Sequence, residues 1–339
     1  MKDKYLLSPD VLQFIESENY SDAANFYFNQ QIKEWPQLKI AYESLNSIQV
    51  KTYWFDNFKI IAQYNPNRIK STTANVEENS QSSSDCFLCE KNLPEKQKGI
   101  VLKNNYTLLC NPFPIFPEHF TIPNIEHQPQ QIKNSFNDFL FFSKIFGKRY
   151  SLIYNGPKCG ASAPFHLHFQ MGTKNFMSIE NDIQQMKNDF GKALVETEEI
   201  SIFNVDDKCR KILFIESKKI NAISQAFGLI YEELKLISKL NEEPMLNIIS
   251  SYDGEFGWSL IIFLRTKHRP DIFYKTDESK MLVSPATIDI GGIFIVPQKK
   301  DFERVNTDTI KNIFREVSLD EKEFLKLSEN LQIKFKDQF

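Results

Sequence analysis

Histidine, cysteine and glycine are scarce in this chain of 339 residues, with 5, 5 and 11 copies. A low and odd number of cysteines argues against a secreted protein held together by disulfides. No apolar run reaches the roughly 18 residues of a membrane span, and the first residues lack the apolar core of a signal peptide. We therefore expect a cytoplasmic protein that neither binds nor crosses a membrane.

A large excess of charge of one sign is also absent, since the formal net charge is only −3. A dedicated nucleic-acid-binding protein would show a basic excess, so we expect no nucleic-acid partner. With 41% hydrophobic and 25% charged residues, the composition is that of a folded globular protein. The length predicts about two domains, with enough chain to bury a core without disulfides.

The spacing of apolar residues predicts an α+β chain. Residues 1–50 read as helices and 71–85 as a polar, Ser-rich linker. An order of strand, helix, strand, strand then occurs twice, and the prolines near its first strands are typical of edge strands. The helices are expected at 130–146, 219–240, 308–314 and 320–331, and the strands at 51–55, 58–65, 106–116, 119–123, 150–156, 165–172, 211–216, 245–252, 257–266 and 291–297. We predict a helical extension (1–50), a first half (51–176) and a related second half (177–339).

His166, His168 and Gln170 alternate along the predicted strand 165–172. A period of two places all three on one face, with Leu167 and Phe169 on the opposite, buried face. Burying unpaired polar groups is costly. The face is therefore either a solvated surface with two chance histidines or a functional site.

Cys86 and Cys89 have a spacing at which two thiolates can bind one tetrahedral zinc ion. The same spacing occurs in redox motifs, and two small apolar residues can also open a core segment. A zinc site would need two more ligands, for which the sequence offers His119, His127 and His166.

The loop directly before the histidine strand runs from Asn155 to Ser162 and contains Gly156 and Gly160. Glycines allow backbone N–H groups to approach an anion closely. An ordinary connecting loop would also fit, but the position before His166 and His168 favours a contact with phosphate.

Taken together, the segments CFLC, NPFPIFPEHFTIPNIEH and NGPKCGASAPFHLHFQ resemble the histidine-triad superfamily. More specifically, they resemble the branch with galactose-1-phosphate uridylyltransferase, GDP-hexose phosphorylases and diadenosine tetraphosphate phosphorylases. Within this branch, the chain resembles a bacterial group more than any one named enzyme. The segment SPATIDIGGIFIVPQKKDFERV is similar to part of the GDP-hexose phosphorylases. The resemblance implies two histidine-triad-like halves of antiparallel sheets with packed helices, the second half being degenerate.

The resemblance also implies a role for each matching residue. His168 would be the nucleophile that attacks an α-phosphate to form a nucleotidyl-histidine, and Gln170 would hydrogen-bond the phosphoryl oxygens. The substrate phosphates would be contacted by Arg68, Asn155, Gly160 and Ser162. A structural zinc ion would be held by Cys86, Cys89, His127 and His166, with His127 preferred to His119 as the third ligand.

The implied activity is transfer of a nucleoside monophosphate from a nucleotide-sugar or a dinucleoside polyphosphate to phosphate or a sugar 1-phosphate. Two alternatives are a histidine-triad hydrolase, which uses water as the acceptor, and a non-catalytic zinc-stabilised nucleotide-binding module. A basic run could hold the acceptor's phosphate or form a solvated strand end; it consists of Arg265, Lys267, His268 and Arg269. Relatives are often dimers, so a second copy of the chain is a candidate partner.

Overall fold

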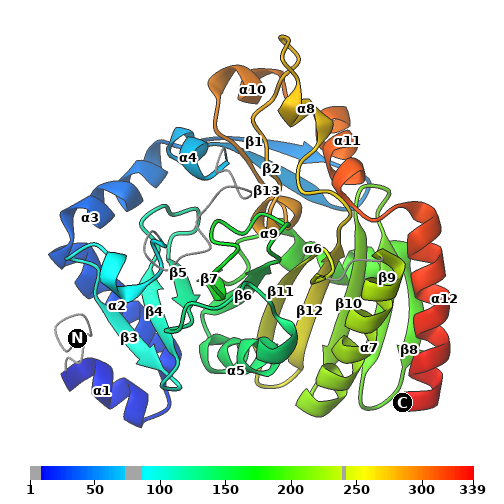
Figure 1. The fold of residues 1–339 in the computed structure, drawn as a ribbon, viewed down its shortest axis with the longest axis horizontal. Coiled ribbons are helices and arrows are strands. Elements are labelled where there is room, and N and C mark those ends of the chain that lie inside the picture. The colour runs from blue at the N-terminus through cyan, green and yellow to red at the C-terminus, as the bar shows by residue number, and fades with distance from the viewer. Residues whose placement is uncertain (1–8, 73–85, 239–241) are drawn as a thin grey trace.

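A computed structural model describes residues 9–72, 86–238 and 242–339 (Figure 1). The segment predicted to be helical, residues 1–50, contains α1 (Pro9–Glu16), α2 (Tyr20–Glu34) and α3 (Pro36–Glu43). Its last residues already belong to a strand, because β1 begins at Gln49. Most of the predicted linker, residues 73–85, lies outside the described residues. Helix α2 packs against α3 and against α5 of the first half.

One antiparallel sheet of ten strands crosses the molecule in the order β3-β4-β5-β7-β6-β11-β12-β10-β9-β8 (Figure 1). The first half contributes β3 (Gly99–Leu102), β4 (Tyr106–Cys110), β5 (His119–Pro123), β6 (Tyr150–Asn155) and β7 (His168–Thr173). The second half contributes β8 (Gly191–Glu196), β9 (Ser201–Asp206), β10 (Lys211–Ser217), β11 (Leu246–Asp253) and β12 (Gly257–Leu264).

The two halves repeat one topology. Each has three strands, one long helix and two more strands, and the helices are α5 (Phe136–Phe146) and α7 (Ile220–Ser238). The halves meet where β6 pairs with β11 and Asn155 lies opposite Asn247. This confirms the α+β fold with antiparallel sheets and packed helices, and it shows that both halves share one sheet. The residue bounds of the three predicted segments stay a prediction.

Both faces of the sheet are covered, so alternate residues of the central strands enter two different cores. On β12, Leu260 and Ile262 pack with residues of α5 and α7, whereas Ile261 and Phe263 belong to the core on the opposite face. Double coverage explains why these strands read as continuous apolar runs. The remaining helices are α4 (Ile69–Thr72), α6 (Ser178–Phe190), α8 (Asp271–Tyr274), α9 (Thr287–Ile290), α10 (Lys299–Arg304), α11 (Thr307–Val317) and α12 (Glu321–Gln338).

A second, three-stranded sheet joins segments that are far apart in the sequence. The hairpin of β1 (Gln49–Trp54) and β2 (Lys59–Tyr64) pairs in parallel with β13 (Ile293–Val296). This pairing brings the segment before β13, which includes α9, next to the first half (Figure 1).

Several sequence predictions are wrong in detail. Helix α6 and strands β3, β8 and β9 were missed. Strands β4 and β5 are not edge strands, because β3 and β7 flank them. Their prolines instead lie in the connection between β4 and β5 or at the end of β5. Strand β7 begins at His168, so His166 lies in the turn before it and not on the strand. No helix in the described part of the chain is long and apolar enough to cross a membrane.

Candidate functional site

A cleft at the junction of the two halves gathers most of the residues predicted to contact substrate. The predicted residues along its walls are Arg68, Asn155, Gly160, Ser162 and Gln170. The second half adds His268 and Arg269, which belong to the basic run, and also Ser284 and Asp289, which the sequence did not single out.

Gly160 allows the two halves to approach closely in this cleft. Its φ is +90°, in the region that favours glycine, and a Cβ atom placed on it would lie 2.5 Å from the Cβ atom of Ala286. Any larger residue would therefore push the loop before β7 away from the segment that precedes α9.

The hydrogen bonds of His168 determine which ring nitrogen can act as a nucleophile. The side chain is 2% exposed, and its Nδ1 atom lies 2.7 Å from the carbonyl oxygen of His166. A carbonyl can only accept, so Nδ1 carries the proton and Nε2 carries the lone pair. Within the described residues, no hydrogen bond engages Nε2. Burial lowers the pKa of His168 to about 4, which keeps the ring neutral at pH 7.

His119 orients Gln170 and takes no part in the cysteine cluster. The backbone N–H of Ile115 donates to His119 Nδ1 at 3.3 Å, so the ring proton is on Nε2, which lies 3.0 Å from Gln170 Oε1. Because His119 donates to the amide oxygen, the amide N–H groups of Gln170 remain as donors for a ligand. Burial lowers the pKa of His119 to about 3, which preserves this arrangement near neutral pH.

The side chain of Asn155 is fixed in one orientation. Its Oδ1 atom accepts from the backbone N–H of Thr287 at 2.9 Å, from Thr287 Oγ1 at 2.7 Å and from Asn247 Nδ2 at 2.9 Å. These donors identify the oxygen, so Nδ2 is the group of Asn155 that can donate to an anion in the cleft.

Gln130 is a site residue that the sequence reading missed. The residue is 1% exposed. Its Oε1 accepts from the backbone N–H of His168 at 2.8 Å. Its Nε2 donates to the carbonyls of Asn155 and His168 at 2.9 and 3.0 Å. The pairing of β6 with β7 reaches only to Ile153 and Gln170. Gln130 therefore ties the two strands together beyond that point. Nothing in the sequence signals this role, since the residue falls at the start of a predicted helix.

Cys86, Cys89, His127 and His166 form a compact cluster whose ligand atoms all lie within 4.8 Å of one another. Cys86 Sγ is 3.2 Å from His166 Nδ1, and Cys89 Sγ is 3.3 Å from His127 Nδ1. His166 Nε2 lies 2.7 Å from the carbonyl oxygen of Asn124, to which it donates, so the lone pair of Nδ1 faces the thiols. Two thiols and two imidazoles with such an outer hydrogen bond fit a tetrahedral zinc ion.

Arg68 approaches the cleft from the short helix after β2. Its Nη1 donates to the carbonyl of Phe113 at 2.9 Å. Burial lowers the pKa of Arg68, and the carboxylate of Asp289 acts in the opposite direction. A cation at this wall suits a phosphate-bearing ligand.

The basic run is divided by the fold. Arg265 is buried, with hydrogen bonds to Asn247 Oδ1 at 2.7 Å and to several backbone carbonyls, so it is structural. Lys267 pairs with Asp271 and Glu316 outside the cleft. His268 and Arg269 line the cleft itself. The run as a whole is therefore neither a phosphate-binding site nor a solvated strand end.

Comparisons with known proteins agree with this architecture. One family model, described as a domain of unknown function (DUF4922), matches residues 27–173, and the GDPGP1-like C-terminal domain matches residues 183–337. A search of curated proteins finds no significant match.

Among solved structures, yeast Ap4A phosphorylase Apa2 in complex with Ap4A aligns with a TM-score of 0.57 at 13% identity, covering 93% of this chain and 99% of that one. Apa2 in complex with AMP aligns with a TM-score of 0.55 at 12% identity, covering 85% and 96%. Identities this low show a shared fold. Together with the match to the GDPGP1-like domain, they support the resemblance to the histidine-triad superfamily and to its branch with galactose-1-phosphate uridylyltransferase, GDP-hexose phosphorylases and diadenosine tetraphosphate phosphorylases.

Proposed function

We propose that this protein is a nucleotidyltransferase of the phosphorylase type. It takes a nucleoside monophosphate from a nucleotide-sugar or a dinucleoside polyphosphate and passes it to phosphate or a sugar 1-phosphate. The similarity to this superfamily branch supports a nucleotidyl-transferring enzyme. The observation that carries the proposal is the state of His168, whose Nδ1–H donates to the carbonyl of His166, so that the lone pair is on Nε2.

In the first step, Nε2 of His168 attacks the α-phosphorus of the donor. A P–N bond forms, and the bond from the α-phosphorus to the bridging oxygen breaks. The leaving group departs with the electron pair as a phosphate ester, which needs no proton. Gln170 and Asn155 donate to the phosphoryl oxygens, and Arg68 offsets the charge that develops on them.

In the second step, an oxygen of the acceptor attacks the same phosphorus. The P–N bond breaks, and its electron pair returns to Nε2, so His168 is neutral again. Through both steps the proton stays on Nδ1, which donates it in a hydrogen bond to the carbonyl of His166. No other residue has to deliver or remove a proton when the acceptor is a phosphate dianion.

The metal that fits the cysteine and histidine cluster is zinc, and it would be structural. Bound there, zinc would link the segment at Cys86 and Cys89 to the turn at His166 and stabilise the fold. His166 would then have two roles: its ring would bind the metal, and its carbonyl accepts the hydrogen bond from Nδ1 of His168.

The test is a screen of donors by intact-mass spectrometry on zinc-loaded protein. GDP-, UDP- and ADP-sugars and diadenosine tetraphosphate are incubated with the wild type and with His168→Ala, and the mass gain identifies the nucleoside monophosphate attached. We expect an adduct in the wild type and none in the variant. If no donor labels the folded, metal-loaded wild type, the proposal is wrong.

Product analysis separates transfer from hydrolysis. The isolated adduct is mixed with phosphate, with a hexose 1-phosphate or with buffer alone. Discharge that requires an acceptor supports a transferase or phosphorylase, whereas discharge at one rate in all three solutions indicates a hydrolase.

A further inference from the structure

Arg269 is held firmly in the part of the cleft wall that the second half supplies. It is 9% exposed, Nε donates to Ser284 Oγ at 3.0 Å, and Nη2 donates to the carbonyl of Thr72 at 3.0 Å. Its guanidinium carbon also lies 4.3 Å from the ring centre of Phe273, within the range of a cation–π contact. These contacts come from three separate segments, so the cation is preorganised at the cleft.

The neighbours of Arg269 are suited to an anion. Ser284 accepts from Arg269, which leaves its hydroxyl proton for a ligand. His268 also lines the cleft, and burial lowers its pKa to about 4, so it adds no charge at pH 7. Asp289 is the acid among the described lining residues; it accepts from the backbone N–H groups of Ala286 and Ile295, and burial raises its pKa to about 6.

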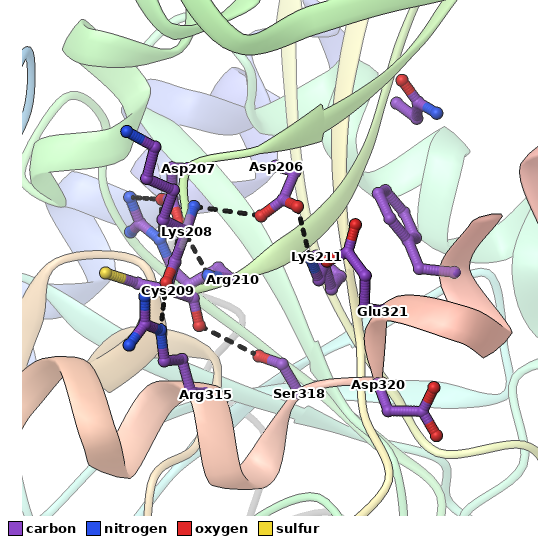
Figure 2. Close-up of polar contacts among 12 residues, drawn as sticks. Asp206, Asp207, Lys208, Cys209, Arg210, Lys211, Arg315, Ser318, Asp320 and Glu321 are labelled. Atoms are coloured by element: carbon purple, nitrogen blue, oxygen red, sulfur yellow. Dashed lines mark hydrogen bonds and ion pairs between the residues drawn. The ribbon is translucent and has the colours of Figure 1, made fainter.

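A second group of basic side chains in the same half, Lys208, Lys211 and Arg315, lines a separate pocket (Figure 2). There, Lys211 pairs with the carboxylates of Asp206 and Glu321, and Arg315 Nε donates to the backbone carbonyl of Lys208. In that pocket, the carboxylates of Asp206 and Glu321 hold the ammonium group of Lys211. In the cleft, a hydroxyl, a backbone carbonyl and an aromatic ring hold Arg269, and these groups are all neutral.

We propose that Arg269, with Ser284 and His268 beside it, forms the subsite for the phosphate group of the acceptor. This inference rests on the proposed function, in which His168 carries the nucleotide. The first half would hold the donor's α-phosphate, and the second half would hold the attacking phosphate, whether free or on a sugar. In this proposal, acceptor binding is what the second half contributes to the reaction.

The test follows the discharge of preformed adduct in the wild type, Arg269→Gln and the matched control Arg315→Gln. Each adduct is freed of donor and mixed with inorganic phosphate, with a hexose 1-phosphate or with buffer alone. In Arg269→Gln we expect the adduct to form more slowly than in the wild type, because the donor's leaving phosphate departs from the position that the attacking phosphate later takes. Discharge by subsaturating phosphate should fall about 10- to 100-fold, the usual effect of losing one charge-assisted hydrogen bond.

Further variants separate binding from folding. Arg269→Lys keeps the charge and should recover part of the phosphate-dependent rate, whereas Arg315→Gln should match the wild type throughout. A larger loss with the hexose 1-phosphate than with inorganic phosphate would identify the sugar phosphate as the acceptor that this wall favours. If adduct on Arg269→Gln responds to both acceptors as the wild type does, the inference is wrong while the proposed function stands. Absence of adduct in the wild type overturns both.

Discussion

Replacing Gln130 by methionine tests whether this buried amide positions the nucleophile. Methionine has a similar length but neither donates nor accepts strongly, so the hydrogen bonds to His168 N, His168 O and Asn155 O are lost. A net hydrogen bond is worth about 1 kcal/mol, so the three bonds predict a loss of about 3 kcal/mol in the free energy of unfolding.

The same change should slow the chemistry. Without Gln130, the backbone at His168 can shift relative to Asn155, and a displacement of about 1 Å typically costs about 100-fold in rate. We expect the rate of adduct formation to fall by that order, while the KM for the donor changes little, because Arg68 and Asn155 remain.

Urea denaturation and intact-mass kinetics measure the two effects. Gln131→Met is the matched control, since Gln131 is adjacent and exposed. Gln130→Glu should recover the bond from His168 N–H, but its carboxylate would face two carbonyls, so it should not recover the rate. The reasoning is refuted if Gln130→Met unfolds within about 0.5 kcal/mol of the wild type and forms adduct at the normal rate.

Three further predictions follow from the cleft and the metal cluster. Cys86→Ser should lose most of its bound zinc and unfold at a lower temperature than the wild type. Zinc analysis and thermal melting measure the two effects. A zinc-free wild type that is as stable as the zinc-loaded protein would contradict the prediction. Gly160→Ala should destabilise by about 1–3 kcal/mol and reduce activity, because the residue has φ +90° and no room for a Cβ atom, whereas Gly254→Ala, with nothing within 4 Å, should be neutral. In the unfolded chain, His119 takes up a proton below about pH 6.5, whereas in the folded protein it stays neutral down to about pH 3. The stability that the neutral His119 contributes is therefore complete above pH 6.5. On acidification below that pH, the free energy of unfolding falls by up to about 1.4 kcal/mol per pH unit. Burial raises the pKa of Glu243 to about 7 and that of Asp289 to about 6. These two carboxyl groups therefore increase the free energy of unfolding as the pH falls, opposite to His119. The difference in the free energy of unfolding between the wild type and His119→Asn, measured with urea from pH 7.5 to 5, isolates the contribution of His119. A difference that does not change with pH would contradict the prediction.

The sequence alone determined much of the local structure and the resemblance to the superfamily. The alternation of His168 and Gln170, the pair Cys86 and Cys89, and the helical spacing of residues 136–146 are short-range patterns set by backbone periodicity. They predicted the two-half α+β fold, and the order of the motifs along the chain was sufficient to show the resemblance.

Only the tertiary structure decided which distant side chains meet. It separated His119, which holds Gln170, from His127, which joins the cysteines, and it divided the basic run by placing Arg265 in the interior and Arg269 in the cleft. The role of Gln130 likewise depends on where β6 and β7 stop pairing. These outcomes depend on packing between segments far apart in the chain, as when β13 pairs with β2, and local periodicity carries no information about such contacts.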